Sequence, residues 1–205
     1  MKTSLWSILK EYWYANTPGT EPSGSNSVNL VMLTLLTILL LIPQQATMIF
    51  SANAEENKNW SIVNDGVMGG LSKGYLESTA DYMLFKGTVS TANYGGFTSA
   101  VLRFNPISVQ PNQKVQLKLK GDGRSFQFRV KADSRESYSY ITSFETNGDW
   151  QTITLPLSSF YPSFRGRTLQ RPNFNHDLLS EVTILIANKK NEDFELLISE
   201  ISMVN

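Results

Sequence analysis

The sequence predicts an all-β domain over residues 55–205, built as a two-sheet sandwich of jelly-roll type. Short segments of this part alternate between apolar and polar residues, most clearly Lys114–Lys120 and Ser125–Val130, as strands with one buried face do. Residues that favour turns separate these segments, and no long window repeats with the period of a helix. Many short strands with turns between them are typical of a two-sheet sandwich.

The connection between the two clearest strands has the composition of a tight turn. Gly121-Asp-Gly-Arg124 lies between them, and both Asp and Gly tolerate the positive φ of a hairpin turn. We therefore expect the two strands to pair as a hairpin, and Asn147–Asp149 to form the turn before Trp150. Six further strands are expected at Tyr82–Val89, Gly96–Phe104, Tyr138–Phe144, Trp150–Leu157, Glu181–Ala187 and Phe194–Ile201.

The N-terminal part, residues 1–54, differs in composition from the rest of the chain. Residues 1–28 are polar and irregular, and an uncharged apolar run follows at residues 30–42. Its length suits the core of a signal peptide better than a spanning helix, which needs about 20 residues. Ala52-Asn-Ala54 offers a small-x-small cleavage pattern. We expect residues 29–54 to be a signal peptide or a membrane anchor, and the protein to be exported or membrane-anchored. An organelle, either mitochondrion or plastid, is the alternative destination.

Composition excludes several kinds of chemistry. The chain has no cysteine, so disulfides, thiolate nucleophiles and Cys-based zinc sites are excluded. Any catalytic triad or His-ligated metal would have to use His176, the single histidine, which lies in a polar loop. Lys plus Arg and Asp plus Glu both number 18, so no net charge attracts nucleic acid. We therefore expect a protein without catalytic residues, cofactor or metal site, and no nucleic-acid partner.

Three glycine-bearing loops are the candidate binding elements: Asn64–Gly70, Asn93–Ser99 and Phe164–Arg167. The first lacks the spacing of a dinucleotide- or nucleotide-binding loop. Gly-Gly pairs in two separate loops suggest a sharp turn or a close approach of the backbone. Alternatively, the acid could cap its own turn and the arginines pair with it internally. The predicted partner-binding residues are Asp65, Gly69, Gly70, Ser72, Gly95, Gly96, Phe97, Arg124, Arg165 and Arg167.

An ordered set of motifs along residues 59–202 resembles the complex I intermediate-associated protein 30 kDa family. The motifs are Trp60, Asp65–Gly70 with Ser72, Phe85–Gly87, Gly95–Ser99, Gly121–Arg124, Tyr140 with Ser143-Phe144, Trp150, Phe160, Phe164–Arg167 and Phe194–Ile201. The resemblance implies a galactose-binding-domain-like jelly roll. It also implies an assembly factor that holds intermediates of the respiratory NADH:ubiquinone oxidoreductase, or of a photosynthetic complex as some relatives do. The N-terminal segment departs from the Arg- and Ser-rich mitochondrial presequence of such factors.

Two functions follow from these observations. The first is a chaperone-like assembly factor whose partners are subunits or intermediates of a membrane complex, with residues 29–50 holding it at the membrane if they are not cleaved. The second is an extracytoplasmic carbohydrate-binding module, in which a glycan stacks on Tyr94, Phe97, Tyr138 and Tyr140. The exposure of Tyr138 and Tyr140 discriminates between the two.

Overall fold

A computed structural model describes residues 46–52 and 59–205. The expectations for residues 1–28 and for the apolar run at residues 30–42 lie outside this part. The strands are β1 (Thr47–Ser51), β2 (Trp60–Asn64), β3 (Lys73–Ser78), β4 (Met83–Val89), β5 (Thr98–Ser108), β6 (Lys114–Gly121), β7 (Ser125–Lys131), β8 (Ser139–Glu145), β9 (Trp150–Pro156), β10 (Tyr161–Phe164), β11 (Arg167–Thr168), β12 (Leu178–Ile186) and β13 (Glu192–Val204). Short 3₁₀ segments interrupt them, among them η2 (Asp65–Met68), η3 (Ala92–Tyr94) and η4 (Leu157–Ser159). Within the described ranges no helix is long and apolar enough to cross a membrane.

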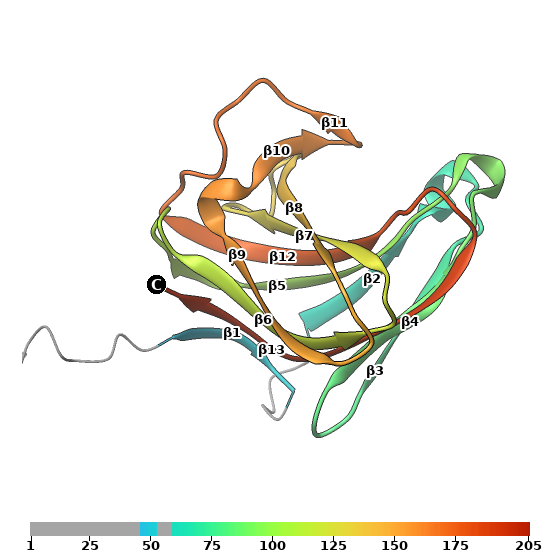
Figure 1. Cartoon of the computed structure of the whole chain (residues 1–205). Coiled ribbons are helices and arrows are strands. Elements are labelled where there is room, and N and C mark those ends of the chain that lie inside the picture. Colours follow the sequence, from blue (N-terminus) through green and yellow to red (C-terminus); the bar gives the residue numbers. More distant parts are fainter. Residues whose placement is uncertain (1–45, 53–58) are drawn as a thin grey trace, which may run out of the picture. The chain divides into compact units, whose positions relative to one another are not determined.

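The strands form two antiparallel sheets that face each other, as the expected sandwich requires (Figure 1). One sheet has the order β3-β4-β13-β6-β9, and β1 also pairs with β13. The other has the order β11-β10-β8-β7-β12-β5-β2. Neighbours in each sheet come from distant parts of the chain, so long-range pairing holds the fold together.

Alternation along the strands builds the core between the sheets. In β6 the side chains of Val115, Leu117 and Leu119 are fully buried, whereas Lys118 on the opposite face is exposed. In β7 the three inward side chains are Phe126, Phe128 and Val130, each no more than 1% exposed. Aromatic rings connect the two layers, with Phe126 against Phe194 of β13 at 6.3 Å between centroids. Such edge-to-face pairs add to the stabilisation that comes from burial alone.

The predicted hairpin between β6 and β7 is wrong. β6 pairs with β13 and β9, whereas β7 pairs with β8 and β12 in the other sheet. The physical reason is that the apolar faces of the two strands pack against each other across the core, so the turn carries the chain from one sheet to the other. Thr146, from the connection between β8 and β9, braces this crossing: its hydroxyl accepts from Gly123 N at 3.0 Å and donates to Arg124 O at 2.9 Å.

All eight predicted strands are present with shifted bounds, and β1, β2, β3, β10 and β11 are additional. β1 lies within the range assigned to a signal peptide or anchor. It pairs with β13 from Thr47 opposite Met203 to Ser51 opposite Glu200. Phe50 is 4% exposed and meets the Trp60 ring edge-on at 5.4 Å. The folded domain therefore begins before residue 55, and cleavage after Ala54 would remove one strand and two core side chains, those of Phe50 and Ala52.

Candidate functional site

Asp65 joins two of the three glycine-bearing loops. It directly follows β2, and its carboxylate is a buried acceptor that is 2% exposed. Ser72 donates to it from the backbone N–H at 3.1 Å and from the hydroxyl at 2.5 Å. From the second loop, the N–H groups of Gly96 and Phe97 donate to Oδ2 at 2.7 and 3.2 Å. One carboxylate thus fixes the loops at residues 65–72 and 91–97 against each other, which gives them a defined shape.

The protonation of Asp65 reflects this network. Burial of the carboxylate acts to raise its pKa, because the charged form loses water. The hydrogen bonds from the Ser72 side chain and from the backbone of Gly96, Phe97 and Ser72 outweigh burial and hold the pKa of Asp65 below its ordinary value. The carboxylate is therefore ionised at neutral pH, and its charge is matched by four donors rather than by a cation.

The Gly-Gly pairs allow the two loops to approach each other. A Cβ added to Gly70 would collide with the Asp65 carboxylate. A Cβ added to Gly95 would lie 2.6 Å from Asp65 Oδ2 and 2.9 Å from the Cα of Gly70. The glycines at these positions are thus explained by close packing around Asp65. This is the close approach that the sequence predicts, although the group approached is an internal carboxylate.

Exposed apolar side chains lie on the loops that Asp65 joins. Val67 is 98% exposed, Tyr94 is 97% exposed and Leu71 is 57% exposed. Asn93 and Tyr94 both have positive φ, 54° and 59°, which is strained for a bulky residue such as tyrosine. Single exposed apolar residues are common, but three on two adjoining loops form a surface suited to contact with another molecule. We name Val67, Leu71 and Tyr94 the loop-tip surface.

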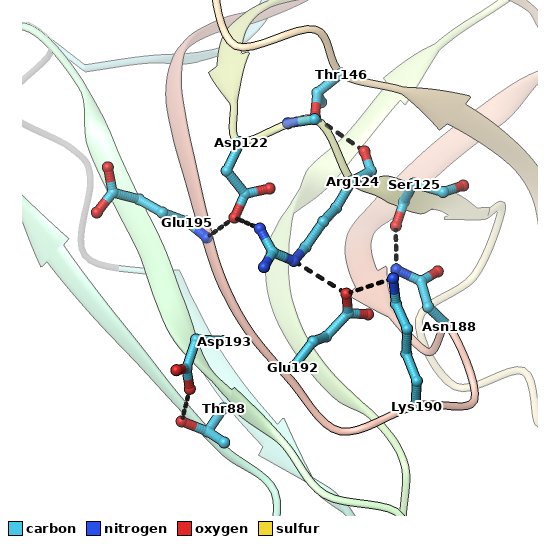
Figure 2. Close-up of polar contacts among 11 residues, drawn as sticks. Thr88, Asp122, Arg124, Ser125, Thr146, Asn188, Lys190, Glu192, Asp193 and Glu195 are labelled. Atoms are coloured by element: carbon cyan, nitrogen blue, oxygen red, sulfur yellow. Dashed lines mark hydrogen bonds and ion pairs between the residues drawn. The ribbon is translucent and has the colours of Figure 1, made fainter.

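Arg124 lies at the same end of the sandwich but is committed to internal ion pairs (Figure 2). Its guanidinium bonds Asp122 at 2.6 Å and Glu192 at 3.0 Å. Glu192 opens β13, and its neighbour Asn191 accepts from Thr91 N at 2.8 Å, which links this network to the second loop. Arg124 therefore ties the crossing between β6 and β7 to β13. Its guanidinium charge is therefore paired within the protein and is not available to a binding partner.

Arg165 and Arg167 do not lie beside Asp65, contrary to the expected single surface. They belong to the hairpin of β10 and β11, at one edge of the seven-stranded sheet, whereas Asp65 follows β2 at the opposite edge. Arg165 and Gly166 have φ of 49° and 77°, as the two central residues of a tight hairpin require. Both arginines are exposed, and Arg165 lies over the Phe164 ring at 5.2 Å.

The other chemically interesting side chains are largely internal. Tyr140 is 5% exposed, and its hydroxyl lies 2.8 Å from Nε2 of His176. Tyr138 is partly buried against the core and carries the Arg171 guanidinium over its ring at 5.1 Å. Tyr138 and Tyr140 therefore offer no open platform for stacking a sugar ring, whereas Tyr94, another of the four aromatics considered for a carbohydrate module, is exposed. No cluster of three metal-ligating side chains occurs in residues 46–52 and 59–205.

Seven of the ten predicted binding residues are thus brought together, Arg124 lies nearby, and two lie elsewhere. Asp65 and Ser72 are buried and organise the loops instead of facing a partner. The exposed members that sequence reasoning missed are Val67 and Leu71. The signal that could have identified them is the presence of apolar residues inside a glycine-rich segment, where no strand alternation explains them.

The sequence pattern of the Complex I intermediate-associated protein 30 family matches residues 48–198. The Complex I intermediate-associated protein 30, mitochondrial, of Mus musculus is 23% identical over 189 residues, which cover 80% of this chain and 57% of the mouse protein. An uncharacterized protein of Schizosaccharomyces pombe is 25% identical over 171 residues, covering 72% of this chain and 78% of that protein.

Among solved structures, the fold is similar to the family 11 carbohydrate-binding module of Clostridium thermocellum, determined in complex with a β-1,3-1,4-mixed-linked tetrasaccharide. The TM-score is 0.60 at 17% identity, with 78% of this chain and 95% of the module covered. At this identity the likeness shows the shared β-sandwich and not a shared ligand. Because the family pattern spans most of its length, this chain belongs to the Complex I intermediate-associated protein 30 family.

Proposed function

We propose that this protein is a non-enzymatic assembly factor that binds incomplete subunits of a membrane complex, of the respiratory complex I type or a photosynthetic complex. The observation that carries the proposal is the loop-tip surface, in which Val67, Leu71 and Tyr94 are exposed on loops held by a buried carboxylate. Family membership supports a partner among complex I intermediates, as the name of the mouse relative indicates. The chain spans little more than half of that relative, so the partner is part of the proposal.

The physical argument is that an unfinished subunit exposes apolar surface that its final neighbours will later cover. A rigid apolar surface binds it without the ordering cost that a flexible loop would bring. Asp65, Gly70 and Gly95 supply that rigidity by packing two loops together, while Val67 and Tyr94 supply apolar area that folding leaves in water. The strained backbone at Tyr94 is consistent with a residue retained for contact rather than for stability.

The test is affinity capture of the tagged full-length chain from detergent-solubilised membranes. We expect subunits of a membrane complex to be recovered, and the recovery to fall at least about tenfold when Val67→Asp is combined with Tyr94→Asn. Both side chains are almost fully exposed, and Asn tolerates positive φ better than Tyr, so the double variant should keep the wild-type stability.

The matched control is Tyr75→Asn, which removes an aromatic side chain that is 54% exposed on β3, outside the two loops. Its recovery should equal that of the wild type. Absence of membrane-complex subunits from the wild-type capture would refute the proposed function. Equal losses in the double variant and the control would refute the loop-tip surface. Specific hits on a glycan array without captured subunits would favour the carbohydrate-binding alternative.

We also propose that residues 29–54 direct export or membrane attachment. Mass spectrometry of the mature N-terminus tests this. A mature chain that begins at Glu55 lacks β1, whereas an uncleaved chain keeps this strand. A terminus produced by cleavage well before Thr47, together with an organellar location, would instead support the organelle alternative.

A further inference from the structure

The outer face of the seven-stranded sheet, which points away from the core, contains apolar side chains that are almost fully buried. Val101 of β5, Ile141 of β8 and Leu185 of β12 lie on this face and do not belong to the core cluster, yet they are only 4–5% exposed. Every residue of β12 after Leu178 is buried, whichever face it points to. Charged groups lie on the same face, among them Arg103, Lys131 and Glu181.

Arg129 of β7 lies in the middle of this face. Ile141 is its register partner on β8 and Thr183 its partner on β12, and Tyr161 of β10 is the next in the same row. The four strands involved lie side by side in Figure 1. Nε and Nη2 of Arg129 both donate to Oε1 of Gln127, at 3.2 and 2.7 Å. One neutral oxygen is thus the partner of two of the five N–H donors.

Arg129 is partly buried and has no carboxylate partner within the described residues. Burial lowers its pKa, and the nearby Tyr161 partly offsets this effect. The other arginines that have no ion pair, Arg165, Arg167 and Arg171, are exposed and can be solvated by water. A guanidinium that is removed from water without an anion is costly to keep, because its desolvation is not compensated.

The carboxylate nearest to Arg129 along this face, that of Glu181, is already paired with two other cations. Glu181 is 3% exposed and lies between Arg103, at 2.8 Å, and Lys131, at 3.3 Å. Arg103 and Lys131 therefore share the Glu181 carboxylate, and Arg129 forms no ion pair with it. Glu145, a further carboxylate of β8, lies four residues along the strand from the register partner of Arg129, about 13 Å away at 3.3 Å per residue.

We infer that Arg129, with Tyr161 beside it and Ile141 beneath, forms a binding site for the carboxylate of an acidic polypeptide segment. The guanidinium fork fits a carboxylate bidentately. The choice of a polypeptide rests on the proposed function, because an unfinished subunit is the partner proposed there. This site is separate from the loop-tip surface and recognises charge instead of apolar area.

The test uses the purified full-length chain in a non-ionic detergent at low ionic strength, with a fluorescein-labelled hexaglutamate peptide as the probe and hexaglutamine as its neutral counterpart. We expect hexaglutamate to bind at least about tenfold more tightly than hexaglutamine. Arg129→Met should weaken hexaglutamate binding by about 10- to 100-fold, since hydrogen bonds to charged groups contribute about 1.5–3 kcal/mol. Arg129→Lys keeps the positive charge but loses the planar guanidinium, so its affinity for hexaglutamate should lie between those of the wild type and Arg129→Met.

The matched control is Arg103→Met, which removes the same charge from the same face but at an arginine already paired with Glu181. It should change the affinity less than about threefold. The melting temperature supplies an independent readout: Arg129→Met should melt no lower than the wild type, because the substitution removes a poorly compensated charge.

Equal losses in Arg129→Met and Arg103→Met would overturn the inference, because net charge alone would then explain binding. A clearly lower melting temperature for Arg129→Met would assign the residue a structural role. Tighter binding of oligogalacturonate or inorganic phosphate than of hexaglutamate would overturn the polypeptide assignment. These outcomes are independent of membrane capture, since purified protein and synthetic probes are used, so either proposal can fail alone.

Discussion

Replacing Asp65 by alanine tests whether this carboxylate organises the loop end. The substitution leaves three backbone N–H groups, those of Ser72, Gly96 and Phe97, without their acceptor. The Ser72 hydroxyl is less affected, because Ser90 O lies 3.3 Å away as an alternative acceptor. An unsatisfied buried donor costs about 1–3 kcal/mol, and the partly buried N–H groups of Gly96 and Phe97 should lie near the lower limit. The expected loss is therefore about 3–5 kcal/mol.

This loss should be visible in urea unfolding followed by tryptophan fluorescence, and as a fall in melting temperature. For a domain of this size, 1 kcal/mol corresponds to about 2–4 °C, so the fall should be roughly 6–20 °C. Asp193→Ala is the matched control, because Asp193 is exposed and accepts a single hydrogen bond, from Thr88 at 2.6 Å. It should change the free energy of unfolding by less than about 0.5 kcal/mol. A loss below about 1 kcal/mol for Asp65→Ala would refute the reasoning.

The same carboxylate predicts a dependence on pH. The pKa of Asp65 in the folded protein is lower than its ordinary value, which is about 3.9 in an unfolded chain. Its ionised form therefore contributes stability above about pH 3.9, and this contribution is lost as the pH falls through the lower, folded-state pKa. The difference in unfolding free energy between the wild type and Asp65→Asn should thus shrink between about pH 5 and pH 2. A difference that stays constant across this range would contradict the prediction.

Two further substitutions test the packing arguments by the same unfolding measurement. Gly70→Ala places a methyl group against the Asp65 carboxylate and should cost about 1–3 kcal/mol, whereas Gly66→Ala, where a Cβ meets nothing within 4 Å, should be nearly neutral; equal effects would refute the close-approach explanation. Phe50→Ala should cost about 3–5 kcal/mol if β1 is part of the domain, whereas Met48→Ala, 51% exposed on the same strand, should cost much less. A neutral Phe50→Ala would show that β1 contributes little to the fold.

Asp65 illustrates how a structural role and a binding role can be separated. On sequence grounds it belongs to a working surface, and its loss should then affect binding without affecting stability. The structure buries it, so its replacement should affect both. The informative variants for binding are therefore those of Val67 and Tyr94, which folding leaves almost fully exposed.

The periodicity of the sequence determined the fold class and most of the strands. Alternation in Lys114–Lys120 and Ser125–Val130 identified the buried faces of β6 and β7 correctly, because alternate side chains of a strand must point to opposite faces. The weaker strands were missed for a related reason. β10 contains Pro162, and β11 has only two residues, so neither shows an alternating pattern long enough to recognise.

Only the tertiary structure decided which strands pair with each other and which charged side chains find an ion-pair partner. The turn at Gly121–Arg124 is compatible with a hairpin, and only the packing of two apolar faces makes it a crossing between sheets. The sequence does not show which of Arg124 and Arg129 has an acidic partner, yet one meets Asp122 and Glu192 while the other meets no carboxylate among the described residues. Local sequence specifies which face of a strand is apolar. Partners across a sheet come from distant segments, so the register of the whole fold determines whether a buried charge is neutralised.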